Sequence, residues 1–80
     1  MPKILEIDGY KFFFYSNEGE PLEKCHIHVR KHIKVAKYWL DPEVSIASNY
    51  GMTSKELNTI EKMIEDNQEL IRRKWHKYFN

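Results

Sequence analysis

The last third of the chain carries a strong amphipathic-helix pattern. Thr53 and Glu56 stand at the two positions of a capping box, in which each side chain satisfies a free backbone N–H at the start of a helix. Apolar residues then recur at helical spacing, with one gap at Asn67-Gln68. We predict one long C-terminal α-helix with a kink or a polar contact at that gap. The apolar stripe consists of Leu57, Ile60, Ile64, Ile71, Trp75 and Tyr78.

An amphipathic helix needs an apolar surface to cover, and the preceding residues have the composition of β-strands. Residues 4–8 and 10–15 flank Asp8-Gly9, a residue pair that favours a tight hairpin turn. Residues 16–23 include asparagine, glycine and proline, which is typical of a loop.

A second hairpin is predicted further along the chain. Residues 25–30 and 35–40 are strand-like, with a turn at 31–34 and a stop at Asp41-Pro42, because proline cannot donate to a strand ladder. Residues 43–50 fit either a short helix or an irregular connection. The predicted fold class is α+β: a small antiparallel sheet of about four strands in two hairpins, covered on one face by the helix.

Composition limits the setting of the protein. Eighty residues suit a single domain, residues 1–80, whose small core would gain support from partner binding or self-association. The one cysteine, Cys25, excludes a disulfide framework within the chain. No apolar run approaches the ~20 residues of a membrane span, and the N-terminus lacks the apolar core of a secretory signal. We expect a cytoplasmic protein.

Charge is unevenly distributed, although the formal net charge is only +1. Residues 24–40 hold five lysines or arginines, three histidines and no acid, whereas residues 41–70 hold seven acids against two lysines. The last ten residues are basic again. This segmentation favours an anionic partner for the first basic segment.

The first basic segment contains the candidate site. In the third predicted strand, Ile27 and Val29 point to one face, and His26, His28 and Arg30 point to the other. Because the aliphatic pair fits the core, we expect the two imidazoles and the guanidinium to share an exposed surface.

Such a surface suits an anionic ligand, with RNA or a nucleotide as the leading class. Histidine and arginine donate hydrogen bonds to phosphate oxygens, and lysine adds charge. Tyr38 or Trp39 would stack on a base. The predicted ligand-binding residues are His26, His28, Arg30 and Lys37. A solvated polar face without a ligand is the plainer alternative.

Two chemical alternatives involve the same residues. A metal-independent ribonuclease would use His26 or His28 as a general base. Arg30 or Lys37 would then stabilise the developing phosphorane. A divalent metal would instead bind the two imidazoles, but it needs a further ligand.

The sequence supplies no clear further ligand for a metal. Cys25 points to the opposite face of the strand, and His32 lies beyond the strand. Asp8 or Glu18 would have to approach from neighbouring segments. We therefore predict no metal and no other cofactor.

Three consecutive phenylalanines predict that both faces of the second strand are covered. Phe12 and Phe14 lie on one face, and Phe13 lies on the other with Lys11 and Tyr15. Either a second layer or a partner must cover Phe13. We expect a protein–protein interface there, and a purely structural interaction module is the third functional alternative.

Four blocks of the sequence carry a family pattern: IDGYKFFFYSNE (7–18), CHIHVRK (25–31), AKYWLDP (36–42) and WHKYF (75–79). They resemble the bacterial domain-of-unknown-function family 4160, whose centre is a His-x-His strand, here His26 and His28. The departure is at the turn, where members often carry glycine and this chain has His32-Ile33.

The resemblance implies a protein partner encoded nearby, in a two-gene module similar to a toxin–antitoxin pair. We therefore predict an interaction module of such a pair that presents its basic His-x-His strand to RNA or another anion.

Overall fold

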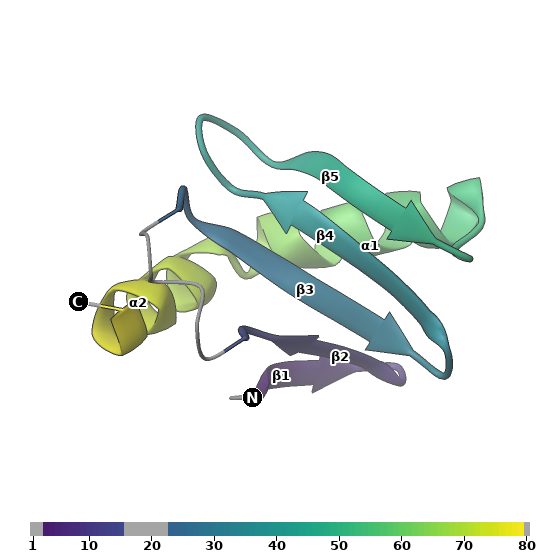
Figure 1. The fold of residues 1–80 in the computed structure, drawn as a ribbon, viewed down its shortest axis with the longest axis horizontal. Helices are drawn as coiled ribbons and strands as arrows, with labels where there is room; N and C mark the ends of the chain where they lie inside the picture. The colour runs from purple at the N-terminus through teal and green to yellow at the C-terminus, as the bar shows by residue number, and fades with distance from the viewer. Residues whose placement is uncertain (1–2, 16–22, 80) are drawn as a thin grey trace.

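The computed structural model describes residues 3–15 and 23–79 of the chain. Five strands form one antiparallel sheet in which each strand pairs with its neighbour in sequence, and the helices lie against one face of it (Figure 1). This arrangement confirms the predicted α+β class, with a different number of elements. The elements are β1 (Lys3–Ile7), β2 (Tyr10–Phe13), β3 (His26–Lys31), β4 (Lys34–Trp39), β5 (Ser45–Tyr50), α1 (Ser54–Asp66) and α2 (Gln68–Phe79).

Both predicted hairpins are present, and each turns through residues with positive φ. Asp8 and Gly9 have φ angles of 50° and 83°, as a two-residue turn of type I′ requires. In the turn between β3 and β4, His32 has a φ of 57°. Glycine adopts that conformation most easily, so the departure from the family pattern falls where the backbone favours glycine. Of the predicted loop at 16–23, residues 16–22 lie outside the described part of the chain.

The predicted count of four strands is wrong, because β5 adds a fifth within the ambiguous residues 43–50. The strand pairs along β4 from Ser45 opposite Trp39 to Tyr50 opposite Val35, with a register shift near Ala47. All six of its side chains are exposed. Since neither face of this edge strand is buried, its sequence lacks the alternation that marked the other strands.

The predicted single helix is also wrong, because the gap in the apolar stripe is a break between two helices. Asn67 ends α1: its backbone N–H donates to the Ile64 carbonyl at 3.1 Å, and its side-chain Nδ2 donates to the Met63 carbonyl at 2.8 Å. The Asn67 carbonyl accepts from the Ile71 N–H at 3.1 Å in α2. The polar contact expected at this position is therefore present, and it separates two helices.

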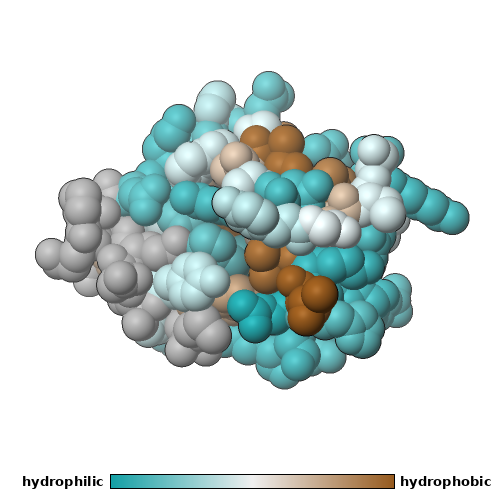
Figure 2. Space-filling view, turned by 45° about the vertical axis from the view of Figure 1, so that its right-hand side comes forward, coloured by the Kyte–Doolittle hydropathy of each residue, from teal (hydrophilic) through white to brown (hydrophobic). Residues whose placement is uncertain are grey.

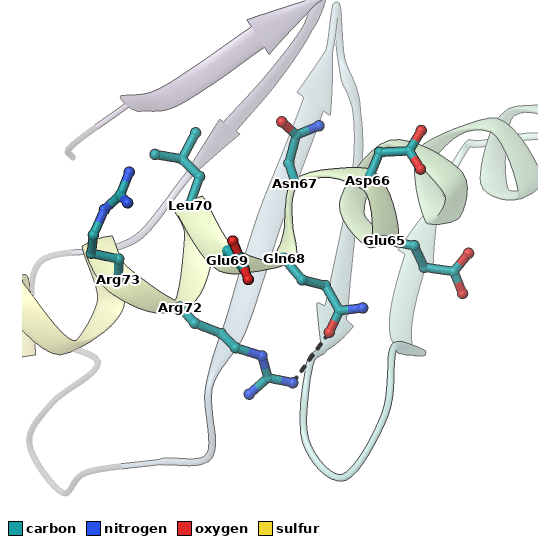
Figure 3. A pocket seen from close by; sticks show the side chains of 8 residues that line it. All are labelled: Glu65, Asp66, Asn67, Gln68, Glu69, Leu70, Arg72 and Arg73. Atoms are coloured by element: carbon teal, nitrogen blue, oxygen red, sulfur yellow. Dashed lines mark hydrogen bonds between the residues drawn. The ribbon is translucent and has the colours of Figure 1, made fainter.

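A hollow of about 660 Å³ lies at this junction and is lined by side chains of both charges (Figure 3). Its Arg72 side chain is already bound. One guanidinium nitrogen, Nη1, lies 2.5 Å from Oδ1 of Asp41, and Nη2 donates to the Leu40 carbonyl at 2.6 Å and to Oε1 of Gln68 at 3.3 Å. The contacts with Asp41 and Leu40 tie α2 to the residues that follow β4.

The predicted capping box at the start of α1 is confirmed. The Glu56 N–H donates to Oγ1 of Thr53 at 3.1 Å, and the Thr53 N–H donates to Oε1 of Glu56 at 2.9 Å. The second carboxylate oxygen of Glu56 lies 2.7 Å from Nζ of Lys34 at the start of β4. The Lys34 ammonium, followed by the Thr53 N–H, lowers the pKa of Glu56 to about 2. One carboxylate thus caps the helix and joins it to the sheet.

We expect this contribution to stability to disappear in acid. Because the pKa of Glu56 falls from its ordinary 4.5 to about 2 on folding, the folded state is favoured above pH 4.5, and the gain is lost as the pH falls through 2. Urea unfolding of the wild-type protein and of Glu56→Gln should differ at neutral pH and converge in acid. Glu65→Gln, at an exposed acid of α1, is the matched control. A difference that stays constant with pH would contradict the assignment.

The core lies between the sheet and the helices. Tyr38 of β4 is fully enclosed, and its hydroxyl donates to the Leu57 carbonyl of α1 at 2.8 Å. Burial raises the pKa of Tyr38 to about 12. The prediction that Tyr38 could stack on a base is therefore wrong. Among the described residues, neither helix is long and apolar enough to cross a membrane.

Candidate functional site: a cationic and aromatic sheet face

The face of the sheet opposite the helices, here called the open face, collects the candidate residues. Side chains opposite each other in an antiparallel pair share a face. The register places Phe13 opposite His28, and His28 opposite Lys37. Cross-strand pairing assigns to the open face Lys3, Glu6, Lys11, Phe13, His26, His28, Arg30, Val35, Lys37, Trp39, Ser45, Ser48 and Tyr50.

His26 has the predicted direction but not the predicted exposure. Its side chain is 0% exposed, with ring centroids of Trp75, His28 and Trp39 at 4.8, 5.2 and 5.4 Å. Its Nδ1 atom lies 2.8 Å from the Lys24 carbonyl. The prediction that His26 lies on an exposed surface is wrong, because the ring of Trp75 in α2 packs against it. Helix α2 lies at the end of the sheet where β3 begins (Figure 1).

His28 is half-buried and belongs to an aromatic cluster with Phe13 and Tyr15. Its ring stacks on Phe13 with 5.6 Å between centroids and an interplanar angle of 24°, and the Tyr15 ring lies 4.4 Å away. Phe13 is only 6% exposed. Its own chain therefore covers Phe13, which removes the reason for expecting a protein partner at that residue.

The cations of the open face differ in their surroundings. Arg30 is exposed. Lys37 is half-buried: its Nζ lies 4.4 Å from the Trp39 ring centroid and 3.6 Å from Oε1 of Glu23. A cation over an aromatic ring is held by the ring's negative face. Lys37 is therefore positioned by its neighbours, while Arg30 points its charge into solvent.

Two hollows lie on the open face on either side of Phe13, which lines both. One, of about 190 Å³, is bordered by His28, Lys37 and Tyr50 among others. The second, of about 240 Å³, is lined by Phe13, Lys3, Lys11 and Arg30. Apolar patches also interrupt the mostly hydrophilic surface in Figure 2. Aromatic rings and positively charged side chains therefore line the same hollows.

The structure gathers part of the predicted set. His28, Arg30 and Lys37 share the open face, whereas His26 lies beneath its neighbours. Lys3 and Lys11 share this face as well, and they were not in the candidate set predicted from the sequence. Lys11 stands opposite Arg30, and only the strand register reveals that proximity. The roles in binding or catalysis stay predictions.

The candidate metal ligands do not assemble among the described residues. In residues 3–15 and 23–79, no three histidine, cysteine, aspartate or glutamate side chains group as a metal site would require. Cys25 packs in the core, and burial raises the pKa of its thiol to about 11. Asp8 lies in the β1–β2 turn, near the end of β3, whereas His26 is at the start of that strand. Glu18 lies outside the described residues.

The comparison with known families gives an assignment without an activity. The family described as a domain of unknown function, DUF4160, matches residues 9–76. The match covers most of the chain, so the chain belongs to this family, as the sequence blocks indicated. No curated protein and no solved structure matches the chain significantly.

Proposed function

We propose that the open face binds single-stranded RNA, as the RNA-contacting member of a toxin–antitoxin-like pair. The observation that carries the proposal is the pair of half-buried Tyr15 and His28 rings, flanked on the same sheet face by Arg30 and Lys37. Open sheets bind single strands by stacking bases on aromatic rings and pairing phosphates with cations. The protein partner encoded nearby remains part of this proposal.

Each group on the face has a distinct part in this proposal. The exposed guanidinium of Arg30 donates to phosphate oxygens in a bidentate geometry that lysine does not offer. Tyr50, 71% exposed at the far edge, presents a ring for stacking. Lys37 adds charge between the tyrosine and His28, because it lines the same hollow as both. The His-x-His strand thus contributes His28, while His26 supports the fold beneath it.

We expect reversal of the two cations to weaken RNA binding at least tenfold. Arg30→Glu/Lys37→Glu should also reduce the dependence of log K on log salt by about 0.7 for each phosphate that the protein no longer neutralises. Fluorescence anisotropy with a labelled single-stranded RNA, at about 50 mM salt and above, measures both effects.

The matched control is Lys55→Glu/Lys62→Glu, which makes the same change in net charge at two exposed lysines of α1. Circular dichroism must show that all three proteins are folded. If wild-type protein fails to bind at low salt, or if both double variants are weakened equally, the proposed surface is wrong. Cleavage of the RNA in the same samples would identify the ribonuclease alternative, with His28 as the imidazole in reach.

A further inference from the structure

Positive charge continues beyond the open face. Three surface hollows follow one another through shared lining residues: Lys11 and Arg30 line the first and second, and Lys3 lines the second and third. The first, of about 420 Å³, reaches the β3–β4 turn, and the third, of about 400 Å³, reaches α2. We call this series the basic track. Its charged or titratable lining residues are Lys3, Lys11, Arg30, Lys31, His32, Lys74 and Lys77, with Tyr78 beside them.

The fold brings lysines from near both ends of the chain into this track. Lys3 is at the start of β1, an edge strand, and Lys74 and Lys77 are on the last turns of α2. All three line the hollow that lies between that strand and the helix, together with Ile4 and Tyr78. No acidic side chain is among the described lining residues of the three hollows.

One acid, Glu6, forms an ion pair with Lys3 of the track. Oε1 of Glu6 lies 3.1 Å from Nζ of Lys3, and the two side chains are 40% and 57% exposed. An exposed ion pair of this kind contributes little to stability. Replacement of this carboxylate by a phosphate at Lys3 would therefore cost little stability. Lys31 is held differently, because its Nζ lies 4.4 Å from the centre of the Tyr10 ring.

We propose that the basic track carries the phosphate backbone of a longer single-stranded RNA from the open face, around the edge of β1, to the C-terminal end of α2. This inference rests on the proposed function and names the path of the ligand. Charge complementarity supports it, since cations line the three hollows and none of their described lining residues is an acid, an arrangement that suits a polyanion. At the C-terminal end of α2 the positive charge comes from the side chains of Lys74 and Lys77, and the helix terminus itself is not an anion site.

A length series separates the track from the open face. RNAs of about 5 and about 16 nucleotides are compared, because single-strand sites on small domains span that range. Wild-type protein should bind the longer RNA at least tenfold more tightly. Lys74→Glu/Lys77→Glu should abolish that gain, lower the salt dependence for the longer RNA by about 1.4, and leave the shorter RNA bound as before.

Lys55→Glu/Lys62→Glu carries the same charge change and should keep the full gain from length. Because acids oppose the dipole at a helix C-terminus, Lys74→Gln/Lys77→Gln is the second variant if the reversal unfolds the protein. If the lysine variants bind the longer RNA as wild type does, the track is wrong while the proposed function stands. Failure of wild-type protein to bind either RNA overturns the proposed function.

Discussion

Replacing Trp75 with alanine should lower the free energy of unfolding by about 3–5 kcal/mol, the range found for large aromatic side chains removed from cores. The Trp75 side chain is 3% exposed. Its ring lies 5.2 Å from Phe14 and 4.4 Å from Phe79 between centroids, and 4.8 Å from His26. Removal of the Trp75 ring would open a cavity between Phe14, Phe79 of α2 and the buried His26. A domain of this size has only about 4–12 kcal/mol of stability.

Urea unfolding followed by far-UV circular dichroism measures this effect without relying on the tryptophan that is removed. Tyr78→Ala is the control, because that ring lies on the same helix but is 45% exposed. We expect it to cost about 1 kcal/mol or less. Trp75→Phe should fall between the two and remains measurable if the alanine variant does not fold. Equal destabilisation in the two alanine variants would mean that α2 is not anchored through Trp75.

The two histidines of the His-x-His strand should separate stability from binding. His26→Ala should cost about 2–4 kcal/mol, because it removes a buried ring and its contact with the Lys24 carbonyl. His28→Ala should cost about 1 kcal/mol, the value of its ring contacts with Phe13 and Tyr15. RNA affinity should follow the opposite order: His28→Ala weakens it, and folded His26→Ala keeps it.

Unfolding and RNA titrations on the same preparations test this pair, at a temperature where both variants are folded. His26→Phe is a useful companion, because it keeps a ring in the buried position while removing both nitrogens. The assignment fails if the two alanine variants are equally destabilised. It also fails if folded His26→Ala loses RNA binding while His28→Ala retains it.

Local chemistry in the sequence was sufficient to predict several elements. The reciprocal hydrogen bonds of Thr53 and Glu56 involve residues three apart, so a four-residue motif is enough to predict the start of the helix. The same holds for the first hairpin, because Asp8-Gly9 itself adopts the required positive φ angles. Alternation also gave the correct direction for His28 and Arg30. In each case the deciding interactions lie within a few residues.

Coverage by distant segments could not be predicted in this way. Alternation states which way His26 points, but its burial depends on Trp75, which is far away in sequence. The fifth strand was missed because an edge strand with two solvated faces has no apolar period. Lys3 and Lys77 line one hollow only because β1 and α2 meet in space.

The interruption at Asn67 also decides how the C-terminal segment fits the molecule. The 26 residues from Ser54 to Phe79 would form a straight rod of about 39 Å, whereas the longest dimension of the whole fold is 33 Å. An unbroken rod would overhang the sheet. By ending one helix and beginning another, Asn67 shortens the span and brings the second helix to the end of the sheet, where its tryptophan shields His26 from solvent.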